Sequence, residues 1–129
     1  MGADDWPPVL RHFESGQFTM KALSYEHQLL EEGNAMQPCV GGYAERCRFE
    51  PLRIFSVRNK RFEQRVSTLS LEEQTPGSWN SDQLKGLRNA EVDPLLWYEV
   101  DGLRRVMNQV SRSDFKTRQF LDFIHSQRR

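Results

Sequence analysis

Basic side chains are concentrated in two parts of this 129-residue chain, and they are the side chains best suited to bind an anion. In the first part only Glu50 and Glu63 interrupt a run of cations, which comprises Arg46, Arg48, Arg53, Arg58, Lys60, Arg61 and Arg65. The second part is the segment 104–129, which has 7 basic and 2 acidic residues and includes Arg104 and Arg105. Such clusters bind phosphate or an acidic protein surface. The second can equally be the ordinary solvated face of a helix.

Arg58, Gln83 and Asn89 form a second kind of candidate site. Arg58 ends one expected strand and Gln83 lies late in another, so neighbouring strands can bring the two side chains together. An arginine beside two amides can bind a phosphate, a base edge or a carboxylate. The same side chains, with Ser56, can instead form an internal hydrogen-bond network. The candidate binding residues are therefore Arg53, Arg58, Arg65, Gln83, Lys85, Arg88, Asn89, Arg104 and Arg105.

Cys39 and Cys47 are the two cysteines, and only Cys39 is a candidate nucleophile. It falls at the start of an expected helix, where the helix dipole lowers the pKa of a thiol. A cysteine enzyme also needs a base, and the nearest histidine in the sequence is His27. We expect both cysteines to be small buried core side chains. Because the sequence contains no Walker-type loop, HExxH motif or serine elbow, we expect no catalytic residue, metal site or cofactor.

The elements that must position these residues are those of an α+β fold. We expect a small antiparallel sheet of about three to four strands, formed by 18–23, 52–58, 62–71 and 79–85. Two short helices are expected near the N-terminus: one over about 25–32, capped by Ser24 and ended by Gly33, and one over 37–48. The chain is expected to be a single domain with a lead-in over 1–16, irregular or a short helix, an α+β core over 17–90 and a helical part over 91–129.

The helical C-terminal part is expected to contain two helices. Asp93-Pro94 is a strong start signal, with Asp93 as the N-cap. An apolar stripe at helical spacing follows, formed by Leu96, Val100, Leu103, Met107 and Val110. We expect Ser111–Ser113 to end this helix and Phe115–Gln127 to form the last one. The last helix carries a second apolar set, Phe115, Phe120, Leu121, Phe123 and Ile124. We expect both stripes to be core, and the alternative is a partner-helix surface, with a homodimer through the Leu96–Val110 stripe.

Overall composition says little about a partner, because 18 basic residues balance 18 acidic ones. No stretch approaches the ~20 apolar residues that a membrane span needs. The N-terminal residues lack both a basic and an apolar leader segment. We therefore expect a cytoplasmic protein without a membrane partner.

Four blocks in the middle of the chain occur in a recognisable order. The first is Leu29–Tyr43 (LLEEGNAMQPCVGGY), which is followed by Cys47 and by the second, Arg53–Arg58 (RIFSVR). The third is Arg65–Leu71 (RVSTLSL), and the fourth comprises Trp79, Gln83, Gly86 and Asn89. Over residues 29–89 the chain resembles the PcfJ-like family. Family members often have a histidine before the first cysteine, where this chain has Pro38, so no base or metal ligand is expected there.

The resemblance implies a biological setting rather than a reaction. The family is similar to an accessory protein of conjugative plasmids and also occurs in phages and other mobile elements. Our first hypothesis is therefore a non-catalytic binding module that engages a protein or nucleoprotein complex of the host or the mobile element. One version inhibits a host defence complex such as a CRISPR effector. The alternatives are a protein that contacts DNA or RNA directly in plasmid conjugation, and a cysteine-dependent enzyme using Cys39.

Overall fold

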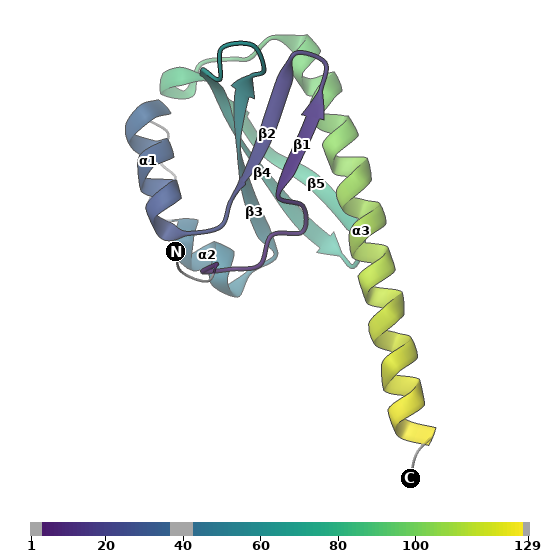
Figure 1. The fold of residues 1–129 in the computed structure, drawn as a ribbon. Coiled ribbons are helices and arrows are strands. Elements are labelled where there is room, and N and C mark those ends of the chain that lie inside the picture. The colour runs from purple at the N-terminus through teal and green to yellow at the C-terminus, as the bar shows by residue number, and fades with distance from the viewer. Residues whose placement is uncertain (1–3, 37–42, 128–129) are drawn as a thin grey trace.

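The computed structural model describes residues 4–36 and 43–127 of the chain. Its centre is a five-stranded antiparallel sheet whose strands lie side by side in sequence order (Figure 1). The strands are β1 (His12–Ser15), β2 (Phe18–Leu23), β3 (Leu52–Asn59), β4 (Arg65–Thr75) and β5 (Ser78–Lys85). The helices are α1 (Glu26–Met36), α2 (Tyr43–Phe49), the short 3-10 helix η1 (Leu87–Asn89) and α3 (Pro94–Gln127). The expected α+β class is confirmed, with one strand more than the upper end of the expected range.

The sheet has an apolar core on each face, and β3 contributes to both. Ile54 packs in the cluster under α1 and α2, together with Leu23, Leu29 and Cys47. Phe55 and Val57 pack in the cluster under α3, whose helical members are Leu96, Val100, Leu103 and Met107. This alternation follows from the strand geometry, because successive side chains point to opposite faces. Figure 1 shows α1 and α2 on one side of the sheet and α3 on the other.

β1 is the strand that the sequence pattern did not reveal, since it lies in the expected lead-in. It pairs with β2 across a tight turn at Gly16-Gln17, where Gly16 has a left-handed φ of +59°. Among the four residues of β1 only Phe13 is apolar, which is too little alternation to predict a strand. A Cβ added to Gly102 would lie 3.4 Å from Phe13 Cζ, so β1 also makes a close contact with α3.

The C-terminal part is one helix of 34 residues, so the expected break at Ser111–Ser113 is wrong. Serine lowers helix propensity only slightly. Here the Ser111 hydroxyl also accepts a hydrogen bond from Trp79 Nε1 at 2.9 Å, which binds α3 to β5. α3 begins at Pro94 with Asp93 as its N-cap, as expected, because the Leu95 N–H donates to Asp93 Oδ1 at 2.9 Å.

The two apolar stripes of α3 have different environments. The first is core from Leu96 to Met107, as expected, whereas the second is exposed at Phe115, Phe120, Leu121 and Phe123. The expectation of a second core stripe is therefore wrong, because α3 extends beyond the end of the sheet that it covers (Figure 1). In the described ranges 4–36 and 43–127, none of the helices combines the length and the apolar composition needed to cross a bilayer.

The N-terminal helices also differ in detail from the expectations. α1 continues through Gly33 to Met36, and its cap is not Ser24. The Glu26 N–H donates to Asp5 Oδ2 at 2.8 Å, while the Ser24 hydroxyl donates to Asp4 Oδ1 at 2.6 Å. The helix expected over 37–48 appears as α2 from Tyr43 onward, and its first six positions lie outside the described residues.

Candidate functional site

A buried carboxylate joins α1 to the sheet. Glu32 has no exposed surface and accepts hydrogen bonds from Arg65 Nε at 2.9 Å and from the Thr68 hydroxyl at 2.6 Å. It is positioned by helical spacing, since Leu29, Glu32 and Met36 form the buried stripe of α1. Buried charges require a partner, and Glu32 has one charged and one neutral donor. The candidate residue Arg65 is therefore half of an internal ion pair.

Next to this pair, Arg58 lies opposite Arg65 on the β3–β4 ladder. Its Nε is 3.3 Å from the hydroxyl of Ser56, which is fully buried. Within the described part of the chain, the Arg58 guanidinium forms no ion pair. Since Glu32 is bound to Arg65, the guanidinium of Arg58 retains N–H donors for another anion.

Arg58 borders a shallow basin on the part of the sheet formed by β1, β2 and β3. The hollow measures about 380 Å³ and is lined by His12, Glu14, Thr19, Lys21, Arg58, Lys60 and Glu63. The strand register explains the arrangement, because His12 faces Lys21 and Thr19 faces both Glu14 and Arg58. Three of these side chains are cationic (Lys21, Arg58 and Lys60) and two are carboxylates (Glu14 and Glu63).

One carboxylate of this basin is already neutralised from within. Glu14 lies 3.2 Å from His12 Nε2 and 3.2 Å from Lys60 Nζ. The hydrogen bond from His12, and then that from Lys60, lowers the pKa of Glu14. In the described residues neither Lys21 nor Arg58 has such an ion-pair partner. These two cations are therefore the pair most available to an anion.

Arg53 has a different role, which is to hold backbone segments together. Its Nε donates to the carbonyl of Pro7 at 2.9 Å, and its Nη1 donates to the carbonyls of Cys47 at 3.0 Å and Leu52 at 2.6 Å. Burial lowers the pKa of its guanidinium. Because carbonyls of the N-terminal segment, α2 and β3 occupy these donors, Arg53 acts as a structural link in this structure.

The structure does not bring Arg58 and Gln83 together. Arg58 pairs with Arg65 and Gln83 with Ser70, so they are offset by five residues along β4, about 16 Å. Gln83 is exposed, and its backbone N–H donates to the Ser70 hydroxyl at 3.1 Å. Lys85 lies nearer than Gln83 to the Glu32–Arg65 pair, because it is opposite Thr68, whose hydroxyl donates to Glu32.

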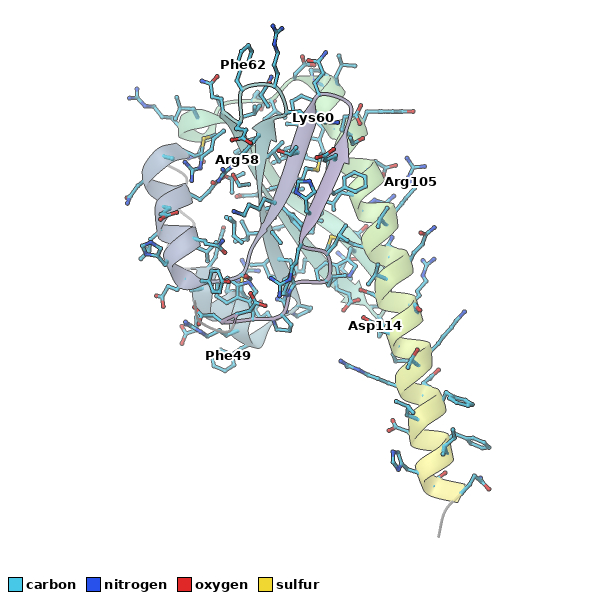
Figure 2. All side chains as sticks on the ribbon, in the orientation of Figure 1. Phe49, Arg58, Lys60, Phe62, Arg105 and Asp114 are labelled. Atoms are coloured by element: carbon cyan, nitrogen blue, oxygen red, sulfur yellow. The ribbon has the colours of Figure 1, made fainter. Side chains whose placement is uncertain are left out.

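The remaining candidates are in η1 and α3. Arg88 and Asn89 are exposed and have left-handed φ angles of 55° and 63°. Arg104 and Arg105 pair with Asp101 at 2.7 Å and 3.2 Å. α3 packs on the opposite face of the sheet from α1, and Figure 2 shows Arg105 and Arg58 on different sides of the molecule. The candidates thus do not form one continuous surface.

Cys47 is placed as the core side chain that we expected. It is 1% exposed, and burial raises the pKa of its thiol to about 11. Cys39 lies outside the described residues, so its role stays a prediction. Within the described part of the chain, no group of three or more His, Cys, Asp or Glu side chains is placed to hold a metal ion.

The sequence interpretation missed three residues of this region. Glu32 could have been found, because its spacing from Leu29 and Met36 places it on a buried helix stripe. Lys21 was assigned to a strand, but only the register with β3 brings it near Arg58. Phe62 is exposed in the β3–β4 loop, whereas the sequence pattern placed it inside a strand.

One family model matches the chain, and it describes the PcfJ-like protein family over residues 10–94. The matched span begins just before β1 and ends at the first residue of α3. It therefore contains the whole sheet, the basin and the Glu32–Arg65 pair, and it extends beyond the 29–89 blocks at both ends. No curated protein and no solved structure matches the chain.

Proposed function

The chain belongs to the PcfJ-like protein family, and we propose that it is a binding module that contacts the phosphate backbone of nucleic acid within a nucleoprotein complex. The observation that carries the proposal is the basin around Lys21, Arg58 and Lys60, on a part of the sheet that none of the described helices covers. Phosphate oxygens are strong acceptors for guanidinium and ammonium groups.

The setting we infer is a mobile genetic element and its bacterial host, as the family resemblance implies. A nucleic-acid contact suits a role in plasmid transfer. It equally suits the inhibition of a host defence complex that carries its own nucleic acid, such as a CRISPR effector. Both roles need a binding surface rather than a reaction.

Salt dependence tests the proposal. We expect the affinity for a labelled oligonucleotide to fall steeply with salt, because bound phosphates release counterions. In a Lys21→Ala/Arg58→Ala variant the affinity should fall by about tenfold or more, and the slope of log affinity against log salt should decrease by about two. Fluorescence anisotropy at several salt concentrations measures both quantities.

The matched control is Arg104→Ala, which removes a cation from α3 on the other face of the sheet. Its affinity and salt slope should equal those of the wild type. Binding that is insensitive to salt, or that is unchanged in the double variant, would contradict the proposal.

A second candidate function is that of an adaptor or inhibitor that binds a protein component of the complex. The exposed side chains of Phe120, Leu121 and Phe123 on the projecting part of α3, with Phe115 just before it, favour it. Exposed apolar side chains gathered on one segment commonly mark protein contacts. Capture of the tagged chain from bacterial lysate separates the candidates: a protein complex retained after nuclease treatment supports the second, and nucleic acid recovered alone supports the first.

A further inference from the structure

The loop between β3 and β4 presents an aromatic ring beside the basic basin. Phe62 is 69% exposed and stands at the end of the molecule that Figure 2 shows at the top. A single exposed apolar side chain is ordinary on a protein surface. Its surroundings distinguish this one, because cationic residues precede it at two successive positions, Lys60 and Arg61.

Hydrogen bonds hold this loop in place. Asn59 Oδ1 accepts from the backbone N–H groups of Arg61 at 2.9 Å and Phe62 at 3.2 Å. The Lys60 N–H donates to the carbonyl of Gln17 at 2.7 Å, which ties the loop to the β1–β2 turn. The ring is thus carried on a preorganised loop, and this reduces the entropy cost of binding a ligand.

Two hollows meet at Lys60. One is the basin with Arg58 and Lys21. The other, of about 450 Å³, lies between the two hairpin turns and is lined by Gly16, Gln17, Asn59, Lys60, Arg61 and Phe62. The Arg61 guanidinium lies 5.1 Å from the centroid of the Phe62 ring. An aromatic ring and a guanidinium plane therefore adjoin the cations of the basin.

We propose that Phe62 stacks on an unpaired base, so that the ligand of this surface is single-stranded nucleic acid whose phosphates lie in the basin. The inference rests on the proposed function and deepens it. In a duplex, both faces of each base are covered by its neighbours. A single strand exposes those faces, and proteins bind it by combining a basic groove with exposed aromatic rings.

The test compares a labelled oligothymidylate of about 20 nucleotides with a duplex of equal length, by fluorescence anisotropy at one salt concentration. Phe62→Ala should weaken binding of the single strand by about tenfold. It should leave the weaker duplex binding unchanged, since that depends on phosphates alone. Phe62→Tyr keeps the ring and should restore the affinity. An oligouridylate of the same length shows whether DNA or RNA is preferred.

Phe49 provides the matched control. It is 80% exposed and lies at the opposite end of the molecule (Figure 2), so Phe49→Ala should bind as the wild type does. If Phe62→Ala binds the single strand normally while Lys21→Ala/Arg58→Ala does not, the stacking inference fails and the proposed function stands. If wild-type chain binds neither oligonucleotide, both fail. Because both phenylalanines are exposed, circular dichroism should show the variants to be folded.

Discussion

Three arginines on β3 and β4 differ in what their guanidinium groups contact. Arg53 donates to four backbone carbonyls, and Arg65 donates to the buried carboxylate of Glu32. Among the described residues, the guanidinium of Arg58 hydrogen-bonds to the Ser56 hydroxyl alone, through its Nε. The same residue type therefore acts as a structural link, as an internal counterion and as a candidate ligand-binding group. A substitution at each position should change a different property of the protein.

At Cys47 we predict a thiol that does not react in the folded protein. Burial raises its pKa from 9.0 to about 11, so the reactive thiolate is nearly absent at pH 8. In a Cys39→Ala variant, which leaves Cys47 as the one thiol, a disulfide reagent at pH 8 should react only after urea is added. Absorbance of the released chromophore measures the reaction.

The same raised pKa gives the direction of a stability change. The neutral thiol is the form that the folded state favours, so its contribution to stability is complete below pH 9. It is lost as the pH rises toward about 11, because the unfolded chain ionises first. Stoichiometric labelling of the native variant within a minute at pH 8 would contradict this description of Cys47.

At the scale of elements, the Glu32–Arg65 pair joins α1 to β4, and the two partners are not equivalent. The side chain of Arg65 is 31% exposed, whereas that of Glu32 is 0% exposed. Arg65→Ala leaves a carboxylate buried without its counterion and should lower the free energy of unfolding by about 3 kcal/mol. Glu32→Gln keeps the volume and lets water solvate Arg65, so it should cost about 1 to 2 kcal/mol. Urea unfolding followed by circular dichroism measures both.

Arg104→Ala serves as the control for this comparison, because its pair with Asp101 is partly exposed. Its effect should stay below about 1 kcal/mol. A Glu32→Gln variant less stable than Arg65→Ala would contradict the expectation that an unpaired buried carboxylate is the larger cost.

Local patterns predicted most of the elements, and long-range contacts account for the errors. Asp93-Pro94 marked the start of α3 because both signals act within one turn. The cap of α1 was misassigned because Asp5, a residue 21 positions away in the sequence, supplies it. The two serines expected to end α3 do not, since tertiary packing outweighs a small propensity difference.

The candidate site was predictable only in part, for the same reason. Arg58 could be chosen from its place at the end of a strand. The neighbours that give it a function, Lys21 and His12, depend on the pairing of β1, β2 and β3, which the sequence leaves open. Arg53 was chosen for its charge, but its four carbonyl partners come from separate segments of the chain.

For the molecule as a whole, α3 has one part that stabilises the fold and one part that does not. Asn108 Oδ1 accepts from the Trp79 N–H at 2.7 Å, and Ser111 binds the indole N–H. Beyond Arg118 no described residue of α3 is fully buried. A chain ending after Arg118 should therefore keep its thermal midpoint within about 2 °C in circular dichroism melting.

A chain ending after Met107 is the contrasting case, because it also loses Asn108 and Ser111. It loses the acceptors of both the backbone N–H and the indole N–H of Trp79 together with the helix turns that cover them, and its midpoint should fall by about 10 °C or more. If the longer truncated chain is destabilised as well, the end of α3 packs against something in solution, and its exposed phenylalanines are the first place to look.

The order of the elements along the chain also affects how the protein matures on the ribosome. Each strand pairs with its neighbour in sequence, and the β1–β2, β3–β4 and β4–β5 pairs close over short turns with a small loss of loop entropy, whereas the β2–β3 connection contains α1 and α2. Synthesis proceeds from the N-terminus, and α3 follows all five strands. The face that carries Phe55, Val57, Leu69 and Leu71 is therefore complete before its cover exists. During that interval the nascent chain exposes this apolar face, and we expect it to bind chaperones until α3 emerges and docks.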